Sequence, residues 1–280
     1  MRVPPATKFL DTLEEVKMYR IKCASVVVAL ALLTAICPAQ DKPAQDKKTT
    51  SPASPQAKDI DPLAMRVLKA VSDPLENAKA FRFKALVSEE ELATDGQIVT
   101  FFHTVDVTVQ RPDKVHLVVQ GHGQRVDFYT ANGQTTMWSP DARLYTTLPA
   151  KSTIDEDIAN FRTKGIDMPI APFLRSDFYQ MASKAALTAY VIGRAKIFDV
   201  DVHQLVFTAA DADYQIWVTG GDTPRFVRSE VVNKKLEGKP RTIIQFLDWD
   251  LNPALDANEF TFSKPSDAHE ITLLSIPGGK

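Results

Sequence analysis

The chain has 280 residues, of which 44% are hydrophobic and 24% are charged, and it carries 33 basic and 35 acidic residues. This composition is typical of a globular protein and excludes collagen-like, coiled-coil and wholly disordered chains. A formal net charge of −2 argues against a nucleic-acid binder that depends on a global positive field.

The N-terminal residues have the layout of a secretory signal peptide. An uncharged apolar run of 14 residues, Cys23 to Ile36, follows three basic residues, and it is shorter than the roughly 20 residues that span a membrane. Small side chains at Cys37 and Ala39 suit cleavage after Ala39. We therefore predict a signal peptide region over 1–39 and an exported protein; an uncleaved anchor helix is the alternative.

Acidic residues before Met18 are atypical of the basic start of a signal, so we predict that translation starts at Met18. Cys37 follows the bulky Ile36, which fits a lipidation site poorly, and we do not expect a lipid anchor there. Both cysteines of the chain, Cys23 and Cys37, lie in the signal region, so the mature protein would contain no disulfide. Residues 40–59 contain few apolar side chains, which predicts a disordered linker.

From residue 60 onward the pattern predicts one domain, 60–280, of the α+β class. It opens with an amphipathic helix over Asp61–Lys79, with Asp61 as N-cap and with Pro74 expected to end or kink it near Ser72. Strands with alternating apolar and polar residues follow, joined by tight turns, and this indicates an antiparallel meander. These strands are predicted over Ala80–Val87, Val99–Val109, Val115–Gln120, Asp127–Thr130, Gln134–Ser139 and Leu144–Leu148.

A helical insert over 152–186 interrupts the strands. Thr153–Lys164 has an N-cap candidate in Ser152 or Thr153 and acidic residues in its first turn, and Asp177–Ala186 is a second predicted helix. Strands then resume over Lys196–Thr208, Tyr214–Thr219, Arg225–Lys234, Arg241–Asp250 and Phe260–Phe262.

Several late strands are apolar on both faces. Within Arg241–Asp250, for example, Ile243 and Ile244 have opposite parity, whereas a sheet with one wet face would be polar on one parity. The sheet is therefore covered on both sides or curled around an apolar interior. We predict a strongly curved antiparallel sheet, a half-open β-barrel, with the N-terminal helix and the central helical insert. Side chains or a ligand could fill its interior.

The chain lacks the common catalytic motifs, namely G-x-S-x-G, H-E-x-x-H, the Walker loop and G-x-G-x-x-G. Its five histidines are scattered, so we predict neither a metal site nor any other cofactor. Of three Asp-x-Asp pairs, Asp248 and Asp250 are the best candidates for an acid–base pair, because spacing by two puts both carboxylates on one strand face; a solvated strand edge is the alternative. We predict that the protein is not an enzyme.

Soft and aromatic side chains in and around the insert suit an adaptable apolar site. The candidate ligand-binding residues are Phe101, Trp138, Phe178, Met181, Trp217 and Phe246. For each of them, ordinary core packing is the alternative.

Five stretches resemble an uncharacterised family of predicted periplasmic bacterial proteins, a domain of unknown function. They are DPLAMRVLKAVSDPLENAKAF, VQRPDKVHL, FYTANGQTTMWSPDARLYTTL, YQIWVTGGDTPRFVRSEVV and FLDWDLNPALDANEFTFSKP, and the resemblance runs from Asp61 to Pro265. That family is similar to the superfamily of outer-membrane lipoprotein carriers (LolA-, LolB- and LppX-like). The resemblance implies a LolA-like fold in the periplasm, with helices closing the mouth of the half-barrel over a cavity for acyl chains.

We therefore predict a periplasmic, monomeric binding or carrier protein whose concave face holds a hydrophobic ligand, such as a lipid or a lipoprotein acyl chain. Burial of the ligand would contribute about 0.8 kcal/mol per CH₂ group, and the insert would gate entry. The alternative is an envelope sensor or partner-binding regulatory protein of the same fold, without lipid transport. We expect no nucleic-acid partner and no membrane span in the mature chain.

Overall fold

The computed structural model describes residues 59–121, 123–166 and 168–272. The predicted signal region and start site, the two cysteines and all but the last residue of the predicted linker lie outside these residues. The helices are α1 (Pro62–Asn77), α2 (Ile154–Thr163), the 3-10 helix η2 (Ala171–Leu174) and α3 (Phe178–Ala185). The strands are β1 (Asp59–Ile60), β2 (Ala80–Leu92), β3 (Ile98–Gln110), β4 (Lys114–Gly121), β5 (Gln124–Ala131), β6 (Gln134–Ser139), β7 (Leu144–Pro149), β8 (Thr188–Ile197), β9 (Val200–Thr208), β10 (Ala212–Thr219), β11 (Phe226–Asn233), β12 (Arg241–Leu251) and β13 (His269–Glu270).

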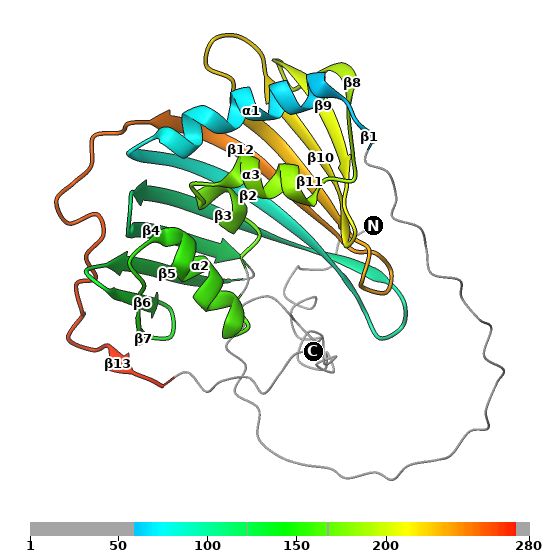
Figure 1. Ribbon diagram of the computed structural model, residues 1–280. Coiled ribbons are helices and arrows are strands. Elements are labelled where there is room, and N and C mark those ends of the chain that lie inside the picture. Colours follow the sequence, from blue (N-terminus) through cyan, green and yellow to red (C-terminus); the bar gives the residue numbers. More distant parts are fainter. Residues whose placement is uncertain (1–58, 122, 167, 273–280) are drawn as a thin grey trace, which may run out of the picture.

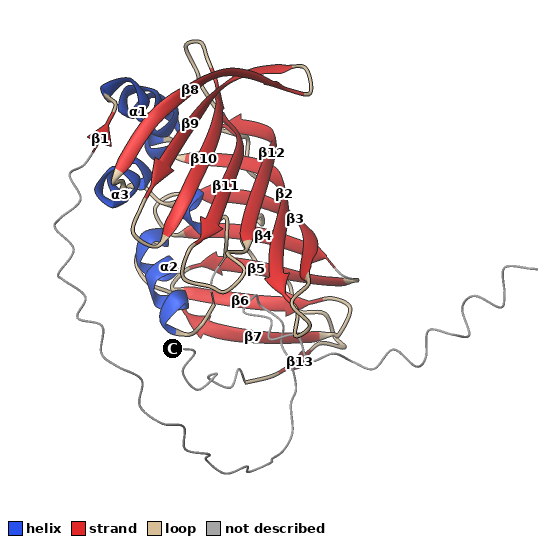
Figure 2. Ribbon diagram, turned by 90° about the vertical axis from the view of Figure 1, so that its right-hand side faces the viewer, coloured by secondary structure: helices blue, strands red, loops and turns tan. Residues whose placement is uncertain are grey.

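All the strands belong to one sheet in the order β1-β8-β9-β10-β11-β12-β2-β3-β4-β5-β6-β7-β13. Two antiparallel meanders, β2 to β7 and β8 to β12, meet where β12 pairs with β2. The short end strands β1 and β13 pair in parallel with β8 and β7. No pairing joins the two ends of the sheet among the described residues, so the sheet curves strongly but does not close (Figure 2).

All the helices lie on the concave side of this sheet (Figures 1 and 2). α1 crosses above one end of the half-barrel, and the segment between β7 and β8 places α2, η2 and α3 over the rest (Figure 1). The prediction of an α+β fold with a curved antiparallel sheet and helices at its mouth is therefore confirmed.

Helix α1 begins as predicted and continues past Pro74. The Asp61 carboxylate accepts a hydrogen bond from the Leu63 amide at 2.7 Å, which satisfies one free donor of the first turn. Of the two predicted effects of Pro74, an end near Ser72 is wrong, because the helix continues to Asn77. The proline removes one backbone donor, but the next residue, Leu75, is only 2% exposed, and its packing against the sheet holds the last turn.

Two strand predictions are also wrong. The chain does not form one strand over Lys196–Thr208, because it turns at Phe198, whose φ is 51°. The preceding residues form β8, a strand that the sequence pattern did not predict. The stretch Phe260–Phe262 forms no strand, because its aromatic rings dock on the sheet instead of pairing with its edge.

The last described residues, 252–272, form a C-terminal segment that covers the convex face of β4 to β7. The Phe262 ring lies 5.6 Å from the Trp138 ring and 5.4 Å from the Tyr145 ring, and the Glu259 carboxylate lies 3.0 Å from the His116 imidazole. This half of the sheet is therefore covered on both faces. On the other half, convex side chains such as Leu247 stay exposed to solvent.

Candidate functional site

The concave face of the sheet, which we call the concave surface, is the apolar interior predicted from the sequence. Directly paired residues on neighbouring strands point to the same side of a sheet. Their side chains therefore form rows that run across the strands on the concave surface. One such row consists of Phe83, Val107, Leu117, Phe128 and Met137, all of which are buried.

An aromatic cluster joins this surface to the helices. Phe173 of η2 lies 4.7 Å from Phe246 of β12, and Phe178 of α3 lies 5.3 Å from Phe226 of β11, measured between ring centroids in edge-to-face geometry. Such pairs stabilise by roughly 0.5–1.5 kcal/mol beyond the area that they bury. The aromatic rings of η2 and α3 thus pack directly against the rings of the sheet. We call the helices that cover the concave surface, α1, α2, η2 and α3, the lid.

A bulge in β12 completes the cluster. The register shifts between Leu247 and Asp250, where Asp248 has a φ of 51°, and this turns Trp249 to the same side as Phe246, with ring centroids 5.4 Å apart.

Asp248 and Asp250 are both exposed. The candidate acid–base pair therefore lies at a solvated bulge, and its nearest cation, Arg82, is 3.9 Å from Asp250.

The structure places four of the six candidate ligand-binding residues on the concave side. Phe178 and Phe246 belong to the aromatic cluster, and Met181 of α3 packs against the core. Phe101 lies on the concave surface near the far end of β3, where it pairs with Glu89 of β2.

Trp138 and Trp217 lie on the convex face, and their assignment to the ligand site needs correction. Trp138 pairs with Asp127 and packs under Phe262, and Trp217 lies under the guanidinium of Arg228 at 5.6 Å. Apolar residues of both parities are present in these strands, so the sequence pattern alone did not separate the two faces.

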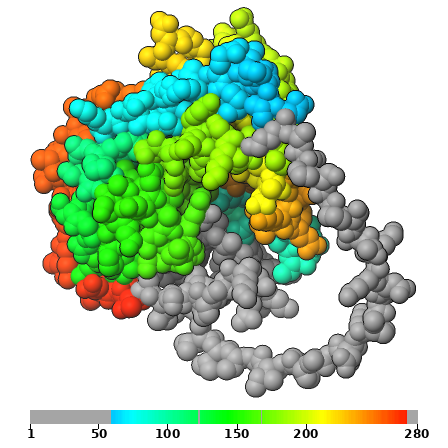
Figure 3. Space-filling view, viewed as in Figure 1, coloured from blue at the N-terminus to red at the C-terminus, as the bar shows by residue number. Residues whose placement is uncertain are grey.

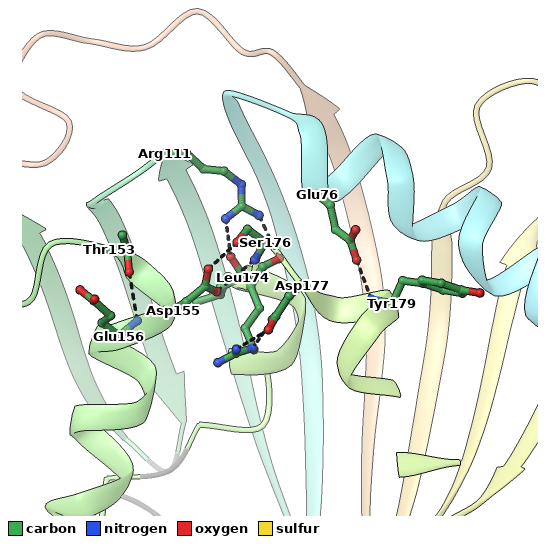
Figure 4. Close-up of polar contacts among 10 residues, drawn as sticks. Glu76, Arg111, Thr153, Asp155, Glu156, Leu174, Ser176, Asp177 and Tyr179 are labelled. Carbon is green, nitrogen blue, oxygen red and sulfur yellow. Dashed lines mark hydrogen bonds and ion pairs between the residues drawn. The ribbon is translucent and has the colours of Figure 1, made fainter. Parts of the chain in front are cut away.

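Arg111, directly after β3, connects the helices that cover the concave surface with the sheet (Figure 4). Its guanidinium donates to the carbonyls of Leu174 at 3.0 Å and Arg175 at 3.1 Å, with a longer contact of 3.5 Å to the carbonyl of Leu75 in α1. It also lies 5.5 Å from the centroid of the Phe81 ring. Burial lowers the pKa of Arg111 from its usual value.

Further hydrogen bonds tie the lid pieces to one another (Figure 4). The Asp155 carboxylate in α2 accepts from the amide of Ser176 at 3.0 Å and from its hydroxyl. The Glu76 carboxylate in α1 accepts from the amide of Tyr179 in α3. α1, α2, η2 and α3 are therefore one connected lid rather than separate helices.

Side chains of η2 and α3 cover the part of the concave surface around Phe226 and Phe246. A cavity of about 30 Å³ lies behind α2, and another of about 10 Å³ lies beside α1. Both are far smaller than the roughly 300–1,000 Å³ of sites that hold drug-sized ligands. Figure 3 shows the helices and the loops between them covering much of this face. A ligand on the part of the concave surface beneath η2 and α3 would therefore have to displace these helices.

Neither metal coordination nor a membrane-spanning helix is found in the described part of the chain. No three His, Cys, Asp or Glu side chains in it form a group able to hold a metal ion. No helix in the same residues has the length and apolarity to cross a bilayer.

A family model described as "Predicted periplasmic protein (DUF2092)" matches residues 64–274. No curated protein matches the chain. Among solved structures, the Mycobacterium tuberculosis lipoprotein LppX is 12% identical with a TM-score of 0.46, over 70% of this chain and 100% of LppX. LprF from Mycobacterium bovis is 13% identical with a TM-score of 0.45, over 75% and 99%. A LolA superfamily protein from Nitrosomonas europaea is 13% identical with a TM-score of 0.29, over 71% and 97%.

Proposed function

Because the chain belongs to the DUF2092 family of predicted periplasmic proteins, we propose that it binds a hydrophobic ligand, a lipid or an acyl chain, on the concave surface in the periplasm. The family description confirms the predicted location. One observation carries the proposal: the concave surface is apolar, and the lid that covers it is a separate group of helices. Arg111 connects this lid to the sheet by hydrogen bonds to the carbonyls of Leu174 and Arg175.

The mechanism that we infer is exchange of lid side chains for ligand. Phe173 and Phe178 occupy the concave surface when the lid is closed. When η2 and α3 move outward, an acyl chain takes the place of these rings, and each buried CH₂ contributes about 0.8 kcal/mol. The protein sequesters and carries its ligand in this proposal and does not transform it.

A protein partner is the second candidate, and the exposed edge of the sheet favours it. β1 covers only Thr188 and Ala189 of the edge strand β8. Beyond them, Ile192 is 55% exposed, and Phe198 at the hairpin tip is 83% exposed. An uncovered apolar edge can pair with an added strand from another chain.

Native mass spectrometry of the protein purified from its own periplasm, without detergent, tests the two candidates. A co-purified lipid supports the ligand-binding proposal. A clean mass of the protein alone, together with a specifically captured protein partner, supports the second candidate instead.

A matched pair of variants on α3 locates the site. Met181 packs against the core, whereas Lys184 on the same helix is exposed. We expect Met181→Asp to weaken uptake of a dansyl-labelled fatty acid by about tenfold or more, equivalent to about 1.4 kcal/mol, and Lys184→Asp to change it less than about twofold. Failure of the wild-type protein to take up any such probe would overturn the proposal.

A further inference from the structure

The cavity behind α2 has a polar feature that the packing of the lid does not explain. It lies between α2 and the strands β4 to β6, has a volume of about 30 Å³, and its wall is mostly apolar, with Leu117 and Phe128 on the sheet side. Among the residues that the structure describes, Asp157 of α2 is the only ionisable one in that wall. A volume of this size suits a small polar group, since about 10–15 Å³ already holds one water molecule.

Asp157 has one oxygen bonded and one oxygen free. The side chain is 4% exposed, and its Oδ1 accepts a hydrogen bond from the amide of Lys151 at 2.6 Å. Its Oδ2 is buried and has no hydrogen-bond partner among the described residues. Burial raises the pKa of Asp157. An unpartnered buried carboxylate oxygen is costly, so its presence needs a reason outside simple core packing.

Two threonines contribute to the wall of the same cavity. Thr130 of β5 and Thr135 of β6 both line it, both are at most 5% exposed, and their Oγ1 atoms lie 2.8 Å apart. One hydroxyl donates to the other, so one hydroxyl proton of the pair is still available to an acceptor. Together with Asp157 Oδ2, the wall offers both an acceptor and a donor to a group placed between them.

The lid forms the remaining wall of this cavity. Leu174 of η2 lines it, and the carbonyl of the same residue accepts the hydrogen bond from Arg111. Phe173, one residue earlier, sits in the aromatic cluster. Outward movement of η2 would therefore remove a wall of the cavity and a ring of the cluster together, and so connect the cavity with the part of the concave surface that the aromatic cluster covers.

We propose that this cavity is the subsite for the polar end of the hydrophobic ligand, and that Asp157 selects a hydroxyl head group over a carboxylate. The inference rests on the proposed function. A hydroxyl donates to Asp157 Oδ2 and accepts from the threonine pair. A carboxylate has no proton to donate and brings a second negative charge against Asp157 in a site that excludes water.

Calorimetric titration with two probes of the same chain length, dodecanol and dodecanoate, tests this selectivity at about pH 8, where an ordinary carboxyl is ionised. We expect the wild-type protein to bind dodecanol about tenfold or more tightly than dodecanoate. We expect Asp157→Asn to lose that preference, because the amide keeps an oxygen for the Lys151 amide but offers an N–H where the carboxylate had its free oxygen.

Asp127→Asn is the matched control. Asp127 is 2% exposed but belongs to the convex face, where it pairs with Arg125 at 2.7 Å, so its replacement removes a buried carboxylate without touching the cavity. The control should keep the tenfold preference. If wild type binds both probes equally, or if Asp157→Asn keeps the preference, the inference falls while the proposed function stands. If neither probe binds to wild type, the proposed function falls as well.

Discussion

Replacement of Arg111 by methionine tests how the lid is held. Methionine keeps much of the packing over Phe81 but removes the two good hydrogen bonds to the carbonyls of Leu174 and Arg175, at 3.0 and 3.1 Å. The contact to Leu75 at 3.5 Å adds little, because a bond of that length is weak.

A hydrogen bond from a charged donor contributes about 1.5–3 kcal/mol. The cost of burying the guanidinium, which also lowers the pKa of Arg111, offsets part of this gain. We therefore expect Arg111→Met to lower the free energy of unfolding by about 2–3 kcal/mol. Because the lost bonds join the lid to β3, amide hydrogen exchange in η2 and α3 should rise more than exchange in the central strands.

Denaturant unfolding followed by circular dichroism measures the first effect, and native-state hydrogen exchange measures the second. Arg82→Met is the control, because Arg82 also donates to a backbone carbonyl, that of Ala254 at 2.6 Å, but from an exposed position. Its loss should cost less than about 1 kcal/mol. If Arg111→Met is as stable as Arg82→Met and hydrogen exchange in α3 is unchanged, the hydrogen bonds of Arg111 do not hold the lid.

Three other changes have defined outcomes. Burial raises the pKa of Asp157 above its ordinary 3.8, so the folded state binds this proton more tightly than the unfolded state, and wild type loses stability as the pH rises through the interval between the two pKa values. Asp157→Asn lacks this loss, so its free energy of unfolding should increase relative to that of wild type as the pH rises above 3.8. A difference between the two proteins that does not change with pH would contradict a raised pKa for Asp157. Phe262→Ala should lower the free energy of unfolding by about 2–3 kcal/mol and shift Trp138 emission to the red, whereas the exposed Leu247→Ala should change stability by less than about 0.5 kcal/mol. Phe198→Asp should leave stability within about 0.5 kcal/mol of wild type, and loss of a captured protein partner in this variant would favour the β8 edge as the interface.

The secondary structure was largely determined by local sequence. Alternating side chains marked nearly every strand, and Asp95–Gly96 marked the turn between β2 and β3, where Gly96 has a φ of 86°. Of the two predicted N-cap candidates, Ser152 and Thr153, it is Thr153 that caps α2, its hydroxyl accepting from the Glu156 amide at 3.2 Å. These signals depend on a few neighbouring residues, and tertiary packing overrode local signals mainly at Pro74 and at Phe260–Phe262.

The composition of the candidate site depended on contacts between distant segments. Trp138 and Trp217 had the right chemistry for a ligand site, but strand pairing and the C-terminal segment place them on the convex face. Conversely, the bulge in β12 turns Trp249 inward, although simple alternation from Phe246 would place it on the other face.

The residues now central to the proposals could not be identified from sequence for the same reason. Arg111 stood out only as part of a turn next to a proline, and its partners lie 63 and 64 residues further along the chain. Asp157 belonged to the acidic first turn of a helix, where its charge is ordinary. The sequence by itself determined which segments are strands and helices, because that information is local and periodic. Only the tertiary structure decided which side chains share the interior, because register, bulges and the docking of the lid are set by the packing of the whole domain.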